Sequence, residues 1–143
     1  MGISSVFDIT GTALNAQSMH IDVIAKNMAN AQVLAGSEAT AYRARRPIFA
    51  AILEASMNNV SGAGSSAGGV RIDGYADSQT PIEKQSMPEN PFADADGYVY
   101  LSNVNLVEEM AHMMEASRNY QSNIEVINTS KQLLMRTISL GSA

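Results

Sequence analysis

Two histidines, an acidic turn motif and a glycine-rich segment are the parts of this sequence whose residue types could carry chemistry. His20 and His112 are its only histidines, and neither has a second histidine or a cysteine at metal-ligand spacing. Residues 94–97, DADG, resemble part of a calcium loop. If Gly97 holds the sixth position, the twelfth falls on Asn103, where a bidentate glutamate is required. We therefore predict packing or solvated roles for the histidines and a β-turn at 94–97.

The common catalytic and cofactor motifs are missing or lack their context. Residues 62–67, GAGSSA, fit a dinucleotide-binding pattern, but a polar loop precedes them and a strand-like segment follows. The sequence contains no nucleophile elbow, no P-loop and no zinc-protease motif. We predict that the protein is not an enzyme and that it has no cofactor and no metal site.

Arg43, Arg45 and Arg46 form the only basic cluster in a chain with a net charge of −5 and a pI near 4.9. In a strand, Arg43 and Arg45 would share one face. The cluster is either a solvated face or a set of ion pairs to an acidic neighbouring subunit. The overall acidity argues against nucleic acid as a partner.

Heptad repeats at both ends of the chain predict the elements that must position these residues. At the N-terminal end, the first line is Phe7, Leu14, Ile21 and Met28, and the weaker second line is Thr10, Gln17, Ile24 and Ala31. At the C-terminal end, the first line is Leu106, Met113, Tyr120, Ile127 and Leu134, and its companion line is Met110, Ser117, Ile124, Lys131 and Ile138. Capping-box patterns at Ser5–Asp8 and Asn105–Glu108 predict helices over about 5–31 and 105–140.

The middle of the chain is different in kind, since all four prolines lie within residues 32–104. Strand-like segments occupy 42–49, 70–75 and 97–101, and a flexible Gly/Ser/Asn/Ala loop occupies 57–69. The sequence therefore predicts an α+β fold, mainly α, in which helices from 1–31 and 105–143 form one coiled-coil core. Residues 32–104 form a small β-rich outer segment.

The C-terminal helix is too long for a compact protein of this size. A helix over 105–140 would be roughly 50 Å long, whereas a globule of 143 residues is roughly 37 Å across. Further apolar residues outside the heptad lines also need cover, namely Val107, Met114, Val126, Leu133 and Met135. Self-association or a partner protein is therefore expected.

The N-terminus lacks the features of a secretory signal, since no lysine or arginine precedes Lys26 and no continuous apolar run follows. No segment reaches the roughly 18 apolar residues of a membrane span. We expect no membrane insertion, and we expect any export to use another signal.

Several segments resemble the bacterial flagellar rod and hook family. They are NPFADADGYV (90–99), NVN (103–105), EM (109–110) and ASRNYQSN (116–123), with ALNAQ (13–17) and NMANA (27–31) near the N-terminus. The short middle and the Leu140-Gly141 ending are most similar to the proximal rod members. Relatives usually carry proline where this chain has Ser102. This departure affects how rigid the backbone is at the start of the C-terminal helix.

The resemblance implies a structural subunit of the proximal rod, the hollow drive shaft that transmits motor torque through the periplasm. Its terminal helices would complete the cores of neighbouring subunits, with Asn27, Asn30, Asn119 and Asn123 as interface residues beside the heptad lines. Expected partners are further copies, other rod proteins and the bushing rings, after type III export with an uncleaved N-terminal segment.

An alternative is a soluble coiled-coil adaptor or secretion chaperone. Such a protein would share the terminal heptads, but it has no use for the segment 97–105 joined to strands. It should form stable helical oligomers alone, whereas rod subunits should have largely disordered termini before assembly. Circular dichroism of the purified chain separates the two.

Overall fold

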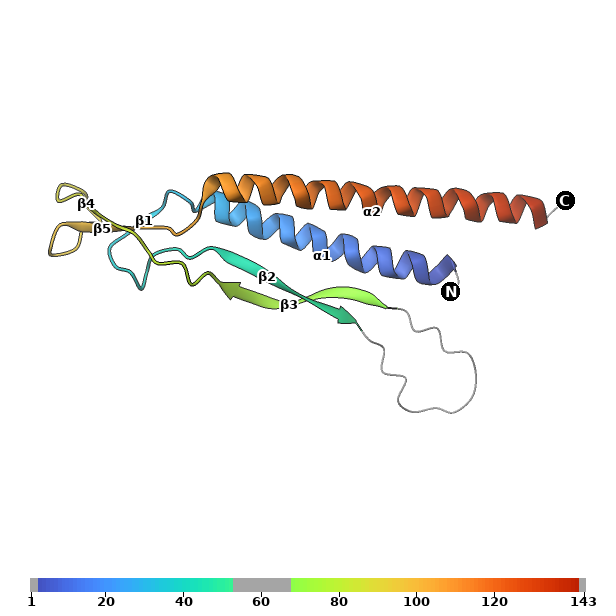
Figure 1. Cartoon of the computed structure of the whole chain (residues 1–143), viewed down its shortest axis with the longest axis horizontal. Helices are drawn as coiled ribbons and strands as arrows, with labels where there is room; N and C mark the ends of the chain where they lie inside the picture. Colours follow the sequence, from blue (N-terminus) through green and yellow to red (C-terminus); the bar gives the residue numbers. More distant parts are fainter. Residues whose placement is uncertain (1–2, 53–67, 142–143) are drawn as a thin grey trace, which may run out of the picture.

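The computed structural model describes residues 3–52 and 68–141 and shows an elongated α+β molecule (Figure 1). Two long antiparallel helices, α1 (Ile3–Ala29) and α2 (Leu106–Gly141), lie side by side. Between them in the chain come the strands β1 (Leu34–Ala35), β2 (Arg45–Ile52), β3 (Gly69–Asp77), β4 (Lys84–Ser86) and β5 (Tyr98–Leu101). Among the described residues, no helix is long and apolar enough to cross a membrane.

Helix α1 begins two residues earlier than its predicted start. Ser5 is buried inside the helix and is not its N-cap, so the capping-box interpretation of Ser5–Asp8 was wrong. The helix ends at Ala29, close to the predicted end. The Lys26 carbonyl accepts two hydrogen bonds from Asn30 there, from the side-chain amide at 2.7 Å and from the backbone N–H at 3.2 Å.

Helix α2 begins as the sequence predicted, with Asn105 as its cap. The Asn105 Oδ1 atom accepts hydrogen bonds from the backbone N–H groups of Val107, at 3.0 Å, and Glu108, at 3.3 Å. The Glu108 carboxylate, however, pairs with Arg46 at 3.1 Å. Glu108 and Glu109 both lie in the first turn, where the helix dipole favours negative charge.

The three predicted strand segments all form strands. β2 and β3 pair antiparallel with a register shift between Ile48 and Phe49, and this hairpin packs along α1. Gly69 allows the close approach, because a Cβ atom there would lie 2.9 Å from the Thr12 hydroxyl. That hydroxyl accepts the Val70 N–H at 3.2 Å. Helix α1 is therefore covered by α2 on one side and by the β2–β3 hairpin on another (Figure 1).

A second, three-stranded sheet in the order β1-β5-β4 lies beyond the helix ends (Figure 1). Its centre is Val99, which is completely buried. Residues 57–67 of the predicted loop 57–69 lie outside the described residues. The glycine pattern at 62–67 lies outside them as well.

The predicted turn at 94–97 is confirmed and sits in the segment that joins β4 to β5. One Asp94 oxygen accepts the backbone N–H groups of Asp96, at 3.0 Å, and Tyr98, at 2.8 Å. The hydrogen bond from Tyr98 is the main cause that holds the pKa of Asp94 below its ordinary value. Gly97 has φ of 80°, a backbone conformation that glycine adopts without strain. We call residues 83–97 the tip of the molecule.

Candidate assembly surface

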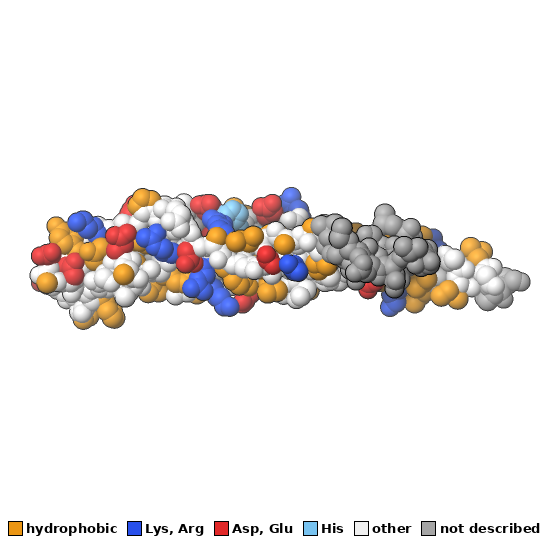
Figure 2. Space-filling model, turned by 90° about the horizontal axis from the view of Figure 1, so that it is seen from below, with side chains coloured by type: hydrophobic (Ala, Val, Ile, Leu, Met, Phe, Trp, Pro, Cys, Tyr) orange, Lys and Arg blue, Asp and Glu red, His pale blue; other side chains and the backbone are white. Residues whose placement is uncertain are grey.

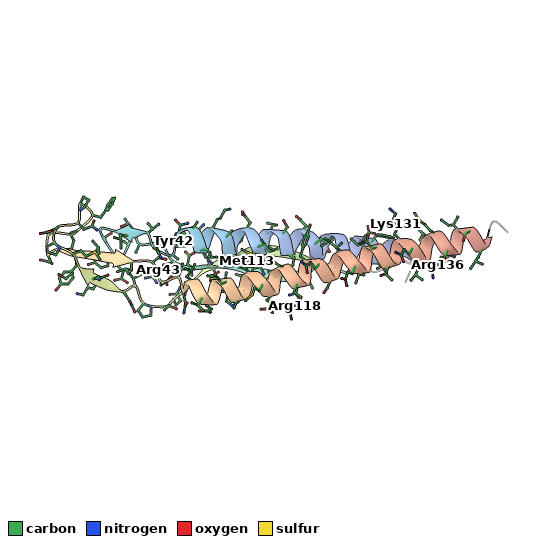
Figure 3. The ribbon with its side chains drawn as sticks, turned by 90° about the horizontal axis from the view of Figure 1, so that it is seen from above. Tyr42, Arg43, Met113, Arg118, Lys131 and Arg136 are labelled. Carbon is green, nitrogen blue, oxygen red and sulfur yellow. The ribbon has the colours of Figure 1, made fainter. Side chains whose placement is uncertain are left out.

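The face of α2 turned toward α1 follows a heptad pattern. One line on it is Met113, Tyr120, Ile127 and Leu134, all half-buried, as the sequence placed them. The other line is Glu109, Ala116, Asn123 and Ser130, of which the first two are fully buried. Figure 3 shows Met113 on the α1 side of α2. The two lines alternate by three and four residues, so small and polar side chains share the helix contact with large ones.

The predicted companion line of α2 is wrong. Met110, Ile124 and Ile138 are exposed in the structure, and the inner line lies one position before that series. Ala116 occupies the centre of the contact and is 1% exposed. A small residue there lets the two helix backbones approach closely, which a large methionine or isoleucine would prevent.

On α1 the weaker predicted line is the more deeply buried one. Thr10 and Ile24 are buried, together with Ala16 and Val23. The four residues of the stronger predicted line are half-buried, and they are Phe7, Leu14, Ile21 and Met28. The reason is that α1 contacts both α2 and the β2–β3 hairpin, so its buried faces are set by two neighbours and not by one seam.

Asn27 lies completely inside the chain, at the joint between both helices and the strands. Its side-chain NH₂ donates to the Arg45 carbonyl at 2.9 Å and to Glu109 Oε2 at 3.2 Å. Its oxygen accepts the Tyr42 hydroxyl and the Arg45 N–H, both at 3.0 Å. These four bonds use the full hydrogen-bonding capacity of an asparagine amide. Asn27 is 0% exposed, so it is available for no contact outside this chain in this conformation.

Glu109 is the buried charge of the same joint, with 1% exposure. Its Oε1 atom lies 3.4 Å from the Arg46 guanidinium, and Arg46 Nη1 lies 2.6 Å from His112 Nδ1. The Arg46 guanidinium thus lies between the Glu109 carboxylate and the His112 ring. We call Asn27, Tyr42, Arg46, Glu109 and His112 the polar junction. Every buried polar side-chain atom of the described residues has a hydrogen-bond partner.

The three arginines of the basic cluster all find acidic partners in their own chain. Arg43 pairs with Glu38 at 3.3 Å, Arg45 with Asp77 at 3.4 Å, and Arg46 with Glu108 and Glu109. The Arg43 guanidinium also donates to the carbonyls of residues 78 and 80. The cluster therefore ties the start of the strands to α2 and to the sheet within one molecule.

A second asparagine, which sequence reasoning left without a role, links the same segments. The Asn103 oxygen accepts the Ala44 N–H at 2.7 Å, and its amide donates to the Thr80 carbonyl at 2.8 Å. Only the NVN resemblance drew attention to this position. Its actual role is a contact with Ala44, which lies 59 residues away in the chain. No local sequence pattern predicts a contact over that separation.

Beside the polar junction, a groove of about 370 Å³ runs between α1, α2 and the hairpin. Asn119 and Asn123 line it from α2, and His20 lines it from α1. The His20 ring meets Phe49 edge-on, with centroids 5.5 Å apart. Burial, followed by the charges of His112 and Arg46, lowers the pKa of His20. Within the described residues, no three His, Asp or Glu side chains gather as a metal site.

The outer faces of α2 carry large apolar side chains that the rest of the described residues leave exposed. All five off-line residues singled out by the sequence are exposed, from 45% for Val126 to 76% for Val107; the others are Met114, Leu133 and Met135. Met110, Ile124, Ile138 and Leu140 extend this exposed apolar surface. Figure 2 shows such side chains on the far end of the helix. Exposed apolar side chains in this number indicate an interaction surface.

Comparison with known proteins defines the class of this molecule. A family model described as the flagellar basal body rod FlgEFG protein C-terminal matches residues 95–140, which include the end of the tip, β5 and nearly all of α2. The C-terminal third of the chain is thus similar to the flagellar basal-body rod class.

Full-length relatives narrow the class further. Flagellar basal-body rod protein FlgC of Escherichia coli O157:H7 is 42% identical over 141 residues, covering 99% of each chain. FlgC of Salmonella typhimurium is 42% identical over 142 residues, again covering 99% of each. FlgC of Buchnera aphidicola subsp. Acyrthosiphon pisum is 35% identical over 142 residues, covering 98% of each. The chain belongs to the FlgC family of flagellar basal-body rod proteins.

Proposed function

We propose that this protein is a structural subunit of the proximal rod of the bacterial flagellum. It polymerises through its terminal helices into the hollow axial shaft, which transmits motor torque. Its action is mechanical and it catalyses no reaction. The observation that carries this proposal is the uncovered apolar surface of α2 in a chain of the FlgC family.

The helices supply the polymer contacts. Helix α2 has 36 residues against 27 in α1, and only Glu109 and Ala116 are fully buried along its whole length. Neighbouring subunits that cover Val107, Met110 and Met114 would each remove apolar area from water, a gain of about 25 cal/mol per Å². Assembly then builds the coiled-coil layer that a single chain leaves incomplete.

The residues proposed for this layer are the half-buried heptad positions, the two groove asparagines and Asn30. They are Phe7, Leu14, Ile21, Met28, Asn30, Met113, Asn119, Tyr120, Asn123, Ile127 and Leu134. Asn27, with no exposed surface, contributes indirectly by holding α1, α2 and the strands in one rigid unit. Arg46 also contributes indirectly, because its ion pairs hold the strands against α2. A shaft that carries torque needs subunits that stay rigid at the polar junction.

The partners proposed are other copies, other rod proteins, the bushing rings that surround the rod, and the flagellar type III export apparatus. The proposed location is the rod where it crosses the periplasm. FlgC relatives and the flagellar rod match support the basal-body assignment.

Substitution on the outer face of α2 tests the proposed function. Met114→Glu places a charge on a side chain that is 67% exposed, so the fold of the single chain should be unchanged while the polymer contact is lost. We expect cells that carry this variant as their sole copy to lose swimming and to lack rods in isolated basal bodies. Ser122→Glu, at an exposed polar position of the same helix, is the control and should swim normally. Normal rods with Met114→Glu would contradict the proposed contact.

A further inference from the structure

The methionines of this chain are concentrated on one helix. The sequence contains nine methionines, and four of them lie on α2: Met110, Met113, Met114 and Met135. A thioether is an apolar side chain, but an oxidant that reaches its sulfur converts it into a polar sulfoxide. The exposure of each methionine therefore decides where an oxidant acts on the folded chain.

Met113 and Met114 are consecutive residues in different surroundings. Met113 lies on the α1 side of α2 and is half-buried (Figure 3). Met114 is 67% exposed. Successive residues of an α-helix differ in direction by about 100°, which accounts for the contrast. The pair provides an internal comparison, because the two thioethers share the same stretch of helix and differ in their exposure.

Met110 belongs to the same exposed face as Met114. It is 51% exposed and lies one helical turn earlier, so the two thioethers are neighbours on the helix surface. Val107, three residues before Met110, is 76% exposed and extends the face. We call Val107, Met110 and Met114 the thioether patch. Glu109 and Ala116 are buried beside it, so this part of α2 is fixed to the rest of the chain while the patch stays exposed.

Two other methionines of the described residues are clearly exposed, but each is isolated. Met19 on α1 is 38% exposed and Met135 near the end of α2 is 57% exposed. Neither has another methionine three or four residues away. Among the described residues, only the thioether patch therefore places two exposed sulfurs on adjacent turns of one helix face.

We propose that Met110 and Met114 form an oxidation site, at which hydrogen peroxide converts the unassembled subunit into a form that cannot join the rod. In each reaction the thioether sulfur attacks one peroxide oxygen, the O–O bond breaks and an S–O bond forms. The sulfur loses two electrons and becomes a sulfoxide. The other peroxide oxygen is reduced and leaves as water with both protons of the peroxide. This inference rests on the proposed function, which gives both methionines contacts with neighbouring subunits.

Oxidation changes the chemistry of the patch and leaves the fold of the single chain intact. A sulfoxide oxygen is a polar acceptor, and burying it among apolar side chains without a donor is unfavourable. Both side chains lie outside the contact with α1, so their oxidation should not alter the stability of the isolated subunit. Subunits that cover the patch also exclude peroxide from it, so the sensitivity is confined to the time before assembly.

Limited treatment of the purified full-length chain with hydrogen peroxide, followed by peptide mass spectrometry, measures each methionine separately. We expect Met110 and Met114 to gain one oxygen about fivefold or more faster than Met113. The same dose applied to isolated basal bodies should oxidise Met110 and Met114 about tenfold or more slowly than in the purified chain. The urea midpoint of the purified chain should be unchanged while Met113 remains reduced.

Glutamine substitution tests the effect on assembly, because glutamine is similar to methionine sulfoxide in length and polarity. Cells whose sole copy carries Met110→Gln and Met114→Gln should lack rods and should not swim. Met19→Gln, at an exposed methionine of α1 outside the patch, is the matched control and should build rods. A chain with Met110→Leu and Met114→Leu keeps the patch apolar without sulfur, so it should build more rods than the glutamine chain.

Three results would each overturn the inference. They are equal oxidation rates for Met113 and Met114, equal oxidation of the patch in basal bodies and in the purified chain, and normal rods with the double glutamine chain. Complementation with the unmodified chain separates this inference from the proposed function. If the unmodified chain builds rods and the glutamine chain does too, the oxidation site is wrong and the rod assignment stands. An unmodified chain that builds no rod refutes the assignment itself.

Discussion

Replacing Asn27 with alanine should lower the free energy of unfolding of the whole molecule, although only one uncharged side chain is changed. The substitution removes four hydrogen bonds at once. It leaves the Tyr42 hydroxyl, both backbone groups of Arg45 and one oxygen of the buried Glu109 without their partner. Each unsatisfied buried group costs about 1–3 kcal/mol, and water entering the small space would satisfy part of them. We expect a net loss of about 3 kcal/mol.

Urea unfolding followed by far-ultraviolet circular dichroism measures this loss. With a slope of about 2 kcal/mol per molar urea, the midpoint should fall by about 1.5 M. The matched control is Asn30→Ala, three residues further along the chain. Its side chain makes one local bond at the surface, to the Lys26 carbonyl, so its change should stay within about 0.5 kcal/mol.

The comparison of the two asparagines decides the matter. Equal midpoints for Asn27→Ala and the parent, or equal losses for Asn27→Ala and Asn30→Ala, would refute the reasoning. Either result would mean that the polar junction does not hold the two helices and the strands together in the isolated chain.

Two further changes test other parts of the molecule. Gly97→Ala should destabilise the tip by about 1–2 kcal/mol, because φ of 80° strains any residue with a side chain and the new Cβ would lie 3.1 Å from Pro88. Urea unfolding measures this loss of stability. The control substitution Ala95→Gly should not produce the same loss. The lowered pKa of His20 means that the folded state resists its protonation, although Glu109 and Glu115 partly offset the effect. Stability should therefore be complete above the ordinary pKa of 6.5 and should fall as the pH drops below it, so the urea midpoint should decrease from about pH 7.5 to about pH 5.5. A His20→Gln chain with an equally large decrease would contradict this cause.

Sequence periodicity placed both helices to within about two residues, and the capping residue Asn105 placed the start of α2. Strand and turn chemistry placed β2, β3 and β5, whereas the short strands β1 and β4 were not predicted. These features are local, which is why residue patterns report them. The inner face of α2 was predicted only in part, because Ala116, Asn123 and Ser130 are small or polar and give no apolar signal.

The polar junction depends on contacts that no local pattern contains. Glu109 and Asn27 are 82 residues apart, and their pairing follows from the register of the two helices. For the same reason, the sequence did not decide whether the arginine cluster is a solvated face or pairs with a neighbouring subunit. Its ion pairs with acidic residues of its own chain depend on the fold, and no local pattern predicts them.

Hydrogen exchange along α2, compared between the isolated chain and intact basal bodies, tests most directly whether the terminal helices need neighbours. In the isolated chain, residues near the polar junction should be protected, because Glu109 and Ala116 are buried there, while residues 128–141 should exchange freely. In basal bodies, both stretches should be protected. Full protection of 128–141 in a lone monomer would contradict the proposal that other subunits must cover this helix.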